Sequence, residues 1–232
     1  SFNSLRSSDD NSTEPTIVAE IVQQLRYFPN LIGGESGLRA SALGSYRYSD
    51  VNTDFDSDGE VDGYDTLRLS LDSDWQRNWT FQNGFIFDLD TELSLSYYDI
   101  QQHFSAKSDI LVNTSAASAG LRWPLIRKNN DGSTAVLEPH IQFASVSING
   151  SDVPNQDSTR VEFDEGNLFK FNRAPGYDLT ETGFRINVGL KGKSYDVNGG
   201  QIGWEIGKVM RAKDTSFSYS SGLSGKSSDW LI

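Results

Sequence analysis

The sequence predicts an all-β fold, an antiparallel transmembrane β-barrel segment of about 9–10 strands that forms an open curved sheet from a larger barrel. First, apolar and polar residues alternate over 79–98, which exceeds the about 5–6 residues of a typical soluble strand and suits the about 9–11 of a tilted membrane strand. Second, alternating segments recur with turn residues between them, as in antiparallel all-β proteins. Third, long polar connections alternate with short ones.

The alternation in 79–98 gives the strand two chemically different faces, because successive side chains point in opposite directions. One set is apolar and aromatic: Phe81, Phe85, Phe87, Leu89, Leu93, Leu95 and Tyr97. The other set is polar: Gln82, Asp88, Asp90, Glu92, Ser94 and Ser96. We expect lipid to contact the first set and water the second. The alternative, a soluble β-sandwich, would force these carboxylates to share a dry core.

The same reasoning predicts charged residues on the wet inner face of the barrel. The candidates for this lumen-facing set are Asp88, Asp90, Glu92, Arg122 and Arg185. Any water-filled pore needs a polar lining. These residues therefore do not identify what passes through it.

The first predicted strand, 16–27, is ambiguous from its pattern. Its apolar residues would also suit one face of a helix: Ile17, Val18, Ile21 and Leu25. The β-branched content and the following Phe28-Pro29-Asn30 favour a strand.

The other strands are predicted from the same period of two. In 64–75 the clearest run is Leu67-Arg68-Leu69-Ser70-Leu71-Asp72, and in 183–194 Phe184 and Ile186 alternate with Arg185. The predicted strands after the first are 38–48, 64–75, 79–98, 112–123, 134–147, 183–194, 199–210 and 215–224.

The connections between these strands differ in length. The long, polar ones are 49–63, 99–111 and 149–182, and the short ones are 73–78, 127–133 and 195–200. We place the long loops outside the cell, as in outer-membrane barrels. Residues 1–15 form a polar, loop-like segment, and 16–232 form a partial barrel with an extracellular loop at 149–182. The apparent strand start at the C-terminal end favours a piece of a larger protein.

The composition excludes several classes of protein. Hydrophobic residues make up 36% of the 232 residues and aromatic residues 12%, yet nothing approaches the about 18 uninterrupted apolar residues of a transmembrane helix. A net charge of -12 argues against nucleic acid, whose phosphates would be repelled. The absence of cysteine excludes disulfides, iron–sulfur clusters and thiolate zinc sites within this segment.

An acidic segment at 54–65 fits the spacing of a twelve-residue calcium loop. Its candidate ligands are Asp54, Asp56, Asp58, Glu60 through its carbonyl, Asp62 and Asp65, with Gly59 at the sharp turn. Asp65 replaces the usual bidentate glutamate, and no helix pattern flanks the loop. The alternative is a solvated acidic hairpin loop. Calcium is thus the one cofactor that the sequence raises.

The residues do not point to an enzyme. His103 and His140 have no acidic partner at ligand spacing, and we interpret them as ordinary polar residues. No G-x-S-x-G elbow or glycine-rich phosphate loop occurs. Carboxylate pairs such as Asp88 with Asp90 are better explained as solvated charge on a lumen wall.

Short motifs occur in a characteristic order from Ala135 onward: Leu137-Glu138-Pro139, Asp157-Ser158, Glu162-Phe163-Asp164-Glu165-Gly166-Asn167-Leu168-Phe169, Asn172-Arg173, Gly176-Tyr177-Asp178, Gly183-Phe184-Arg185-Ile186-Asn187-Val188-Gly189-Leu190 and Gly200-Gln201-Ile202-Gly203-Trp204. Upstream, two more fit the same order: Gly63-Tyr64-Asp65-Thr66-Leu67-Arg68-Leu69-Ser70 and Leu121-Arg122-Trp123-Pro124. In this order they resemble the LptD family of outer-membrane lipopolysaccharide (LPS) assembly proteins, formerly called organic solvent tolerance proteins. The resemblance covers about 40–232, and 162–178 is its most specific part. The motif residues that it marks are Glu138, Pro139, Asp157, Ser158, Asn167, Leu168, Phe169, Asn172, Arg173, Gly176 and Asp178.

The 162–178 cluster is also expected to form an ordered loop on chemical grounds. Phe163, Leu168, Phe169 and Phe171 would give it a small apolar core, and Asn167 and Asn172 would bond local backbone groups. Arg173 could pair with Asp164, Glu165 or Asp178 and hold the loop over the lumen. A well-packed loop without lipid contact is the alternative.

The resemblance implies a very large barrel in the outer membrane of a Gram-negative bacterium. It implies a periplasmic jelly-roll domain before Ser1, which contacts the periplasmic LPS bridge, and closing strands after Ile232. A lipoprotein would plug the barrel, and together they would insert LPS into the outer leaflet through a lateral opening. No catalytic residue is implied. The alternative function is that of a small porin-like or calcium-binding structural outer-membrane β-barrel.

Overall fold

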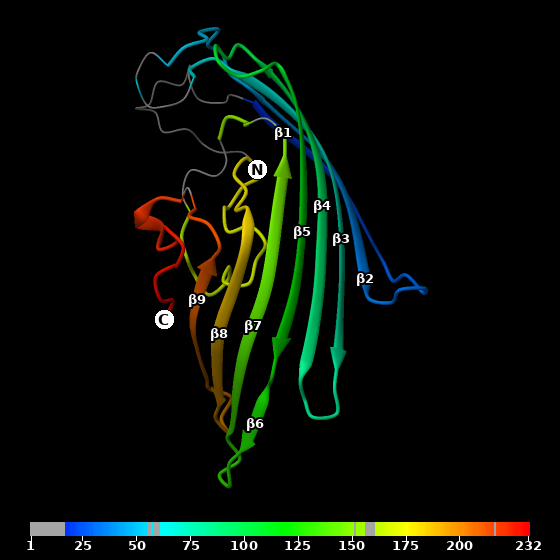
Figure 1. The fold of residues 1–232 in the computed structure, drawn as a ribbon, viewed down its shortest axis with the longest axis vertical. Helices are drawn as coiled ribbons and strands as arrows, with labels where there is room; N and C mark the ends of the chain where they lie inside the picture. Colours follow the sequence, from blue (N-terminus) through cyan, green and yellow to red (C-terminus); the bar gives the residue numbers. More distant parts are fainter. Residues whose placement is uncertain (1–16, 55–56, 58–60, 151, 156–160, 216) are drawn as a thin grey trace.

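The computed structural model describes residues 17–54, 57, 61–150, 152–155, 161–215 and 217–232. These residues form one antiparallel sheet of nine strands, which curves without closing on itself (Figure 1). Its strand order is β1-β2-β3-β4-β5-β7-β8-β9, and β6 pairs with β7. The predicted open, curved all-β sheet is confirmed. The predicted polar segment 1–15 lies outside the described residues.

Apart from the four-residue β6, the strands are long for a globular protein. Their bounds are β1 (Ile17–Tyr27), β2 (Glu35–Tyr46), β3 (Asp65–Thr80), β4 (Ile86–Gln101), β5 (Asp109–Arg122), β6 (Leu125–Lys128), β7 (Thr134–Asn149), β8 (Gly183–Tyr195) and β9 (Gln201–Arg211). A short 3-10 turn, η1 (Tyr219–Ser221), follows. Among the described residues, no helix has the length and apolar character needed to cross a membrane.

The ambiguous first segment is a strand. Residues 17–27 pair along their whole length with β2, from Ile17 opposite Tyr46 to Tyr27 opposite Ser36. The strand that its β-branched residues favoured is therefore confirmed.

The predicted connection at 73–78 is wrong, because β3 continues through it to Thr80. The polar residues there remain in the sheet because their side chains find partners on neighbouring strands. Asp74 accepts a hydrogen bond of 2.6 Å from Arg26. The hairpin turn falls instead at 81–85, where Gly84 takes a left-handed φ of 85° and donates to the Phe81 carbonyl at 2.9 Å. The predicted strand 79–98 is thus the end of β3 joined to β4.

The predicted strand 215–224 is also wrong. Ser218 caps η1 by accepting from the Ser220 backbone, and Gly222 ends it with a φ of 72°. The serine-rich sequence favours such local hydrogen bonds over a strand ladder. Two smaller differences concern β4, which extends to Gln101 and shortens the predicted 99–111 loop, and β6, which was not predicted.

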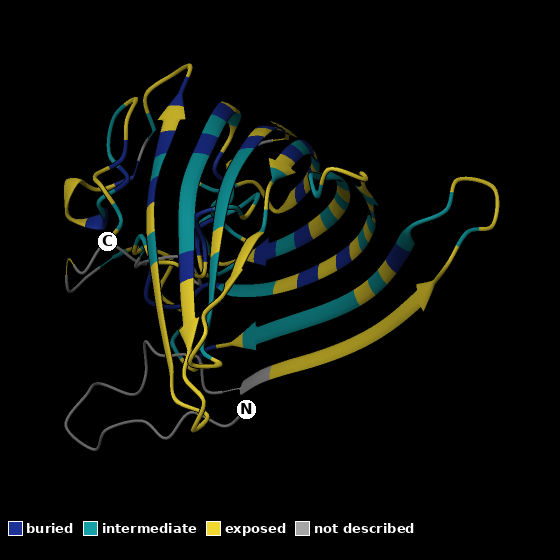
Figure 2. Cartoon of the chain, turned by 90° about the horizontal axis from the view of Figure 1, so that it is seen from below, coloured by how far each residue is buried: buried dark blue, intermediate teal, exposed yellow. Residues whose placement is uncertain are grey.

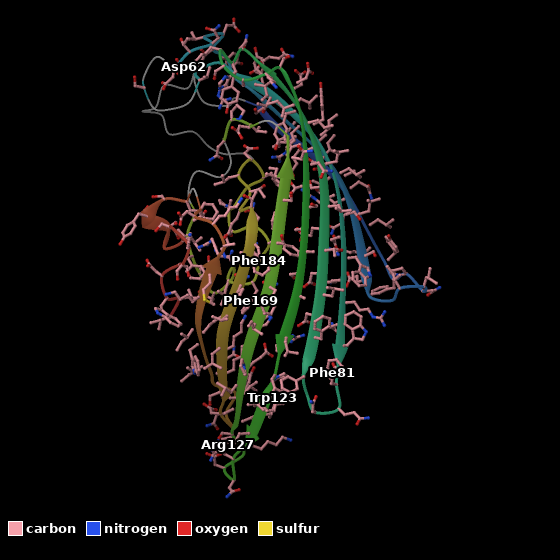
Figure 3. The ribbon with its side chains drawn as sticks, in the orientation of Figure 1. Asp62, Phe81, Trp123, Arg127, Phe169 and Phe184 are labelled. Carbon is pink, nitrogen blue, oxygen red and sulfur yellow. The ribbon has the colours of Figure 1, made fainter. Side chains whose placement is uncertain are left out.

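Long loops and short turns lie at opposite ends of the sheet. Figure 3 labels Asp62 at the loop end, and Phe81, Trp123 and Arg127 at the turn end. The turn end carries aromatic pairs: the rings of Phe85 and Trp123 stack at 4.7 Å. Aromatic rings at this level are typical of the interface between membrane and water.

The sheet has an apolar outer face and a polar inner face. Leu69 of β3 pairs with Tyr97 of β4, and Leu71 with Leu95, and all four side chains are exposed on the outer face. Inward-pointing neighbours such as Arg68 are buried. Figure 2 shows this alternation along the strands, with loops filling part of the hollow of the curved sheet. This is the sidedness that a membrane barrel requires.

A charge placed on the outer face should block membrane insertion. Leu95 lies in the interior of β4 and is 42% exposed. We expect Leu95→Arg to cost about 2–4 kcal/mol near the bilayer midplane. The adjacent Ser94→Arg should be tolerated, because Ser94 points inward and donates to Asp72 at 2.6 Å. Heat-dependent mobility of the full-length protein in SDS gels, with both variants in parallel, would measure the folded fraction. Equal folding of the two variants would contradict the assignment of the faces.

Candidate functional site

Carboxylates concentrate on the inner face of β3 and β4. The register places Asp74 opposite Glu92 and Gln76 opposite Asp90, so that acidic side chains of both strands share one wall. We call this wall the acidic wall, and its carboxylates are Asp72, Asp74, Asp88, Asp90 and Glu92.

Hydrogen bonds from flanking strands satisfy part of the acidic wall. Arg122 of β5 donates to Asp88 at 2.8 Å, and Ser118 donates to Asp90 at 3.1 Å. Arg39 of β2 lies 3.4 Å from Asp72. The sequence-predicted residues Asp88, Asp90, Glu92 and Arg122 therefore lie together on the inner face. Such a wall can bond hydroxyl groups and repel unscreened anions.

The loop between β7 and β8 folds back into the hollow of the sheet. We call residues 161–182 the docked loop. Its Leu168 is completely buried, at 0% exposed. Leu168 and Phe169 rest over two glycines that pair across neighbouring strands, Gly189 of β8 and Gly207 of β9. A Cβ atom on Gly207 would lie 2.3 Å from Leu168 Cδ2, so only glycine leaves room for the loop here.

Phe169 is held from several sides. Its ring stacks on the imidazole of His140 with centroids 3.7 Å apart, and Lys191 Nζ lies 5.5 Å from its centroid. Gln142 donates to the Phe169 carbonyl at 3.1 Å. Figure 3 shows Phe169 about midway along the sheet, between Asp62 at the loop end and Arg127 at the turn end. These contacts fix the loop against β7 and β8.

Buried charges hold the second half of the docked loop. Arg173 donates to Glu181 at 2.5 Å, and Arg211 of β9 donates to the other oxygen of Glu181 at 2.8 Å. The predicted partners Asp164, Glu165 and Asp178 are not those of Arg173. The fold of the loop accounts for this, because Glu181 lies beside Arg211 of β9, whereas Asp164 and Glu165 are exposed.

Glu181 stays ionised despite its burial. Loss of water alone would raise the pKa of its carboxyl, but Arg173, Arg185 and Arg211 together hold that pKa below its ordinary value of 4.5. Neutral or mildly acidic solution therefore leaves the ion pairs intact.

Two asparagines order the loop backbone. Asn167 donates to the Glu162 carbonyl at 2.7 Å and accepts from the Asp164 backbone at 3.2 Å. Asn172 donates to the Leu179 carbonyl at 2.7 Å and accepts from the Ala174 and Glu181 backbones. The loop is thus closed by its own side chains.

The far end of the docked loop reaches the opposite wall of the hollow. Asp178 lies 3.5 Å from Arg68 of β3 and 3.3 Å from the Tyr98 hydroxyl of β4. Arg68 and Arg39 lie over the Tyr177 ring, at 4.3 and 5.2 Å from its centroid. The loop consequently crosses the hollow from β8 and β9 to β2 and β3.

Space remains between the docked loop and the acidic wall. A cavity of about 710 Å³ is lined by Asp72, Asp74 and Glu92 on one side and by Phe171 and Asn172 of the loop on the other. A second cavity, of about 580 Å³, is bounded by Asp88, Asp90, Arg122, His140 and Phe169. Both are large enough for sugar-sized groups and offer many hydrogen-bonding partners.

The structure places the other predicted residues as follows. Glu138 lies 3.8 Å from Arg122, and the Pro139 carbonyl accepts from the Trp123 backbone at 3.0 Å. Arg185 points inward as predicted, but the docked loop covers it. Only 1% of its surface is exposed, so it does not form part of a wet lumen wall. Asp157 and Ser158 lie outside the described residues.

The predicted calcium loop is only partly described, since Asp56, Asp58 and Glu60 lie outside the described residues. Asp65 accepts a hydrogen bond of 2.8 Å from the Arg47 backbone, and Asp62 is buried. Within the described ranges, no group of three or more His, Cys, Asp or Glu side chains could hold a metal ion. Calcium binding remains a prediction.

Four residues that position the loop were not marked from the sequence: Gln142, Glu181, Gly207 and Arg211. Asn187 and Gly189 occur in one of the quoted motifs, but no role in holding the loop was predicted for them. The sequence did contain an indication of the docked loop. Gly189 and Gly207 occupy inward positions of long strands, and a glycine at such a position often marks the close approach of another chain segment.

Two comparisons bear on these observations. A protein-family model described as LptD, LPS transport system D, matches residues 1–232, the whole chain. A search of curated proteins found no match.

Proposed function

The chain belongs to the LptD family of the LPS transport system, and we propose that it forms one wall of the outer-membrane translocon that inserts LPS into the outer leaflet. The family serves LPS transport and assembly at the outer membrane of Gram-negative bacteria. The finer role follows from the two faces of the sheet, the observation that carries this proposal.

The outer face suits hydrocarbon and the inner face suits the hydrated part of a glycolipid. Exposed leucines and aromatic rings line the outside of β3 and β4, and the acidic wall lines their inside. Sugar hydroxyls can bond the carboxylates of this wall, while acyl chains belong with the apolar outer surface. A lateral opening would let the two parts separate into their own environments.

The docked loop narrows the route that cargo can take. It is fixed to β7–β9 by buried contacts, so LPS would pass along the acidic wall and its cavities rather than along β8 and β9. Translocation at this component would be passive, because binding and guidance need no catalytic group. A plug lipoprotein and the periplasmic LPS bridge, acting through an N-terminal domain, would be the partners.

Depletion of the full-length protein tests the proposal. We expect newly made LPS to disappear from the cell surface, measured by labelling intact cells, and to accumulate on the periplasmic side. An unrelated outer-membrane porin, assayed in the same cells, controls for general loss of barrel assembly. Unchanged surface LPS after depletion would reject the transport role and favour a porin-like or structural barrel.

A further inference from the structure

Lys208 is a charged residue on the apolar outer face of β9. The residues on either side of it, Gly207 and Val209, are buried and point inward, so Lys208 points outward. The other outward side chains of β9 are apolar and exposed: Ile202, Trp204, Ile206 and Met210. On β8, which the structure describes in full, every outward position from Phe184 to Ser194 is uncharged. Lys208 therefore places a cation among groups that face hydrocarbon.

Lys208 lies close to the border at which the outer face becomes polar. The register pairs Met210 with Ile186 of β8, and Ile186 with Phe143 of β7, so these three apolar residues lie side by side. Toward the loop end, the next outward residue of β7 is Ser145, which is exposed. Lys208 lies one outward position nearer the turn end than Met210, and its flexible side chain can extend to the border. A lysine is far better tolerated there than at the bilayer midplane.

The protein leaves the charge of Lys208 without a carboxylate. Its Nζ atom lies 5.1 Å from the centroid of the Trp230 ring, a cation–π contact. None of the ion pairs among the described residues includes Lys208. Asp229 precedes Trp230 in the chain, but its carboxylate lies beside Gly222 at the end of η1. The ammonium group thus has an aromatic ring on one side and the membrane on the other.

Two more hydrogen-bond donors lie on the outer face beside Lys208. Ser227 is exposed and pairs with Met210, so it shares the outer face and lies diagonally from Lys208, at a distance of about 7–8 Å. Trp230 is 59% exposed. Neither the Ser227 hydroxyl nor the Trp230 indole N–H has a hydrogen-bond partner among the described residues. An ammonium, a hydroxyl and an indole N–H on one open surface match the oxygens of a phosphate group.

We propose that Lys208, Ser227 and Trp230 bind the phosphate group of a membrane lipid, in the leaflet on the loop side of the membrane. The site lies on the open outer surface, so a lipid headgroup reaches it without displacing any part of the protein. The acyl chains of that lipid run toward the turn end, along Ile206 and Trp204. The phosphate belongs either to LPS or to a glycerophospholipid. This site does not depend on the transport role, since any barrel with this outer face would present it to the membrane.

Lipid binding to the delipidated full-length protein in detergent gives the first test. Native mass spectrometry should show that dimyristoyl phosphatidylglycerol binds the wild type and binds Lys208→Met about tenfold more weakly. This variant should fold, because methionine suits a face that contacts hydrocarbon. Lys193→Met is the matched control, since it removes an exposed lysine of β8 that points inward, and it should bind like the wild type. Dimyristoylglycerol, which has the same chains without the phosphate, should bind all three proteins equally.

Conservative variants give the second test. Lys208→Arg keeps the cation and should retain binding, whereas Trp230→Phe keeps a ring without the N–H and should weaken binding a few-fold. The intact mass of the lipid that co-purifies with the wild type from native membranes would distinguish LPS from a glycerophospholipid. Equal binding of phosphatidylglycerol by the wild type and Lys208→Met, or an equal loss in Lys193→Met, would overturn the proposal. Lys208 would then serve only to anchor β9 at the membrane interface.

Discussion

Glu181→Ala is expected to release the docked loop from the sheet and to lower the stability of the protein. Glu181 accepts from Arg173 and Arg211 and is 3% exposed, so its removal leaves buried guanidinium groups without their carboxylate. Breaking a buried pair from one side costs about 3–5 kcal/mol. Limited proteolysis of the full-length protein in detergent should show faster cleavage within 161–182.

Glu165→Ala is the matched control, because Glu165 lies on the same loop and is exposed. The protease should cleave the loop of this variant at the wild-type rate. The wild-type loop should also stay docked as the pH falls through 4.5, since the neighbouring arginines hold the pKa of Glu181 below that value, and the stabilisation is lost only when the pH falls through the lowered pKa. Cleavage that is equally slow in Glu181→Ala and in the wild type would show that the ion pairs do not hold the loop.

The faces of the sheet could be predicted from the sequence because they depend on one local rule. Side chains alternate on any strand, so Leu95 and Ser94 separate whatever the register is. The turn between β3 and β4 depends on something else. Asp74 and Gln76 look like turn residues until the partners on β1 and β2 are known, and those partners come from strand pairing. A prediction from local polarity therefore placed the turn at 73–78, whereas it lies at 81–85.

The interior of the docked loop shows the same limit. That Asn167 and Asn172 bond nearby backbone could be expected, since those bonds are local. The partner of Arg173 could not be predicted in this way. Asp164, Glu165 and Asp178 lie at similar or shorter distances along the chain and could each form the same ion pair. Glu181 accepts from Arg173 because the folded loop places it between Arg173 and Arg211 of β9. The three-dimensional path of the loop, rather than spacing along the chain, decides which charges meet.

Gly207→Ala should displace Leu168 from its place over β9. The new Cβ would lie 2.3 Å from Leu168 Cδ2 and 3.1 Å from the Val188 carbonyl oxygen, and Leu168 has no exposed surface through which to move away. Overpacking of this kind costs about 1–3 kcal/mol. The midpoint of urea unfolding of the folded barrel should fall, and cleavage of the docked loop should rise with it.

A double-mutant cycle separates this clash from a general effect of alanine in a strand. Gly203→Ala is the control on the same inner face of β9, where a Cβ would meet nothing closer than 3.8 Å, and it should change stability by no more than about 0.5 kcal/mol. Leu168→Ala alone should cost about 2–5 kcal/mol as a cavity. Because the added methyl group occupies part of that cavity, Gly207→Ala with Leu168→Ala should cost less than the sum of the single changes. Strict additivity would mean that Leu168 does not rest on Gly207, and the attachment of the loop to β9 would then depend on the buried charges alone.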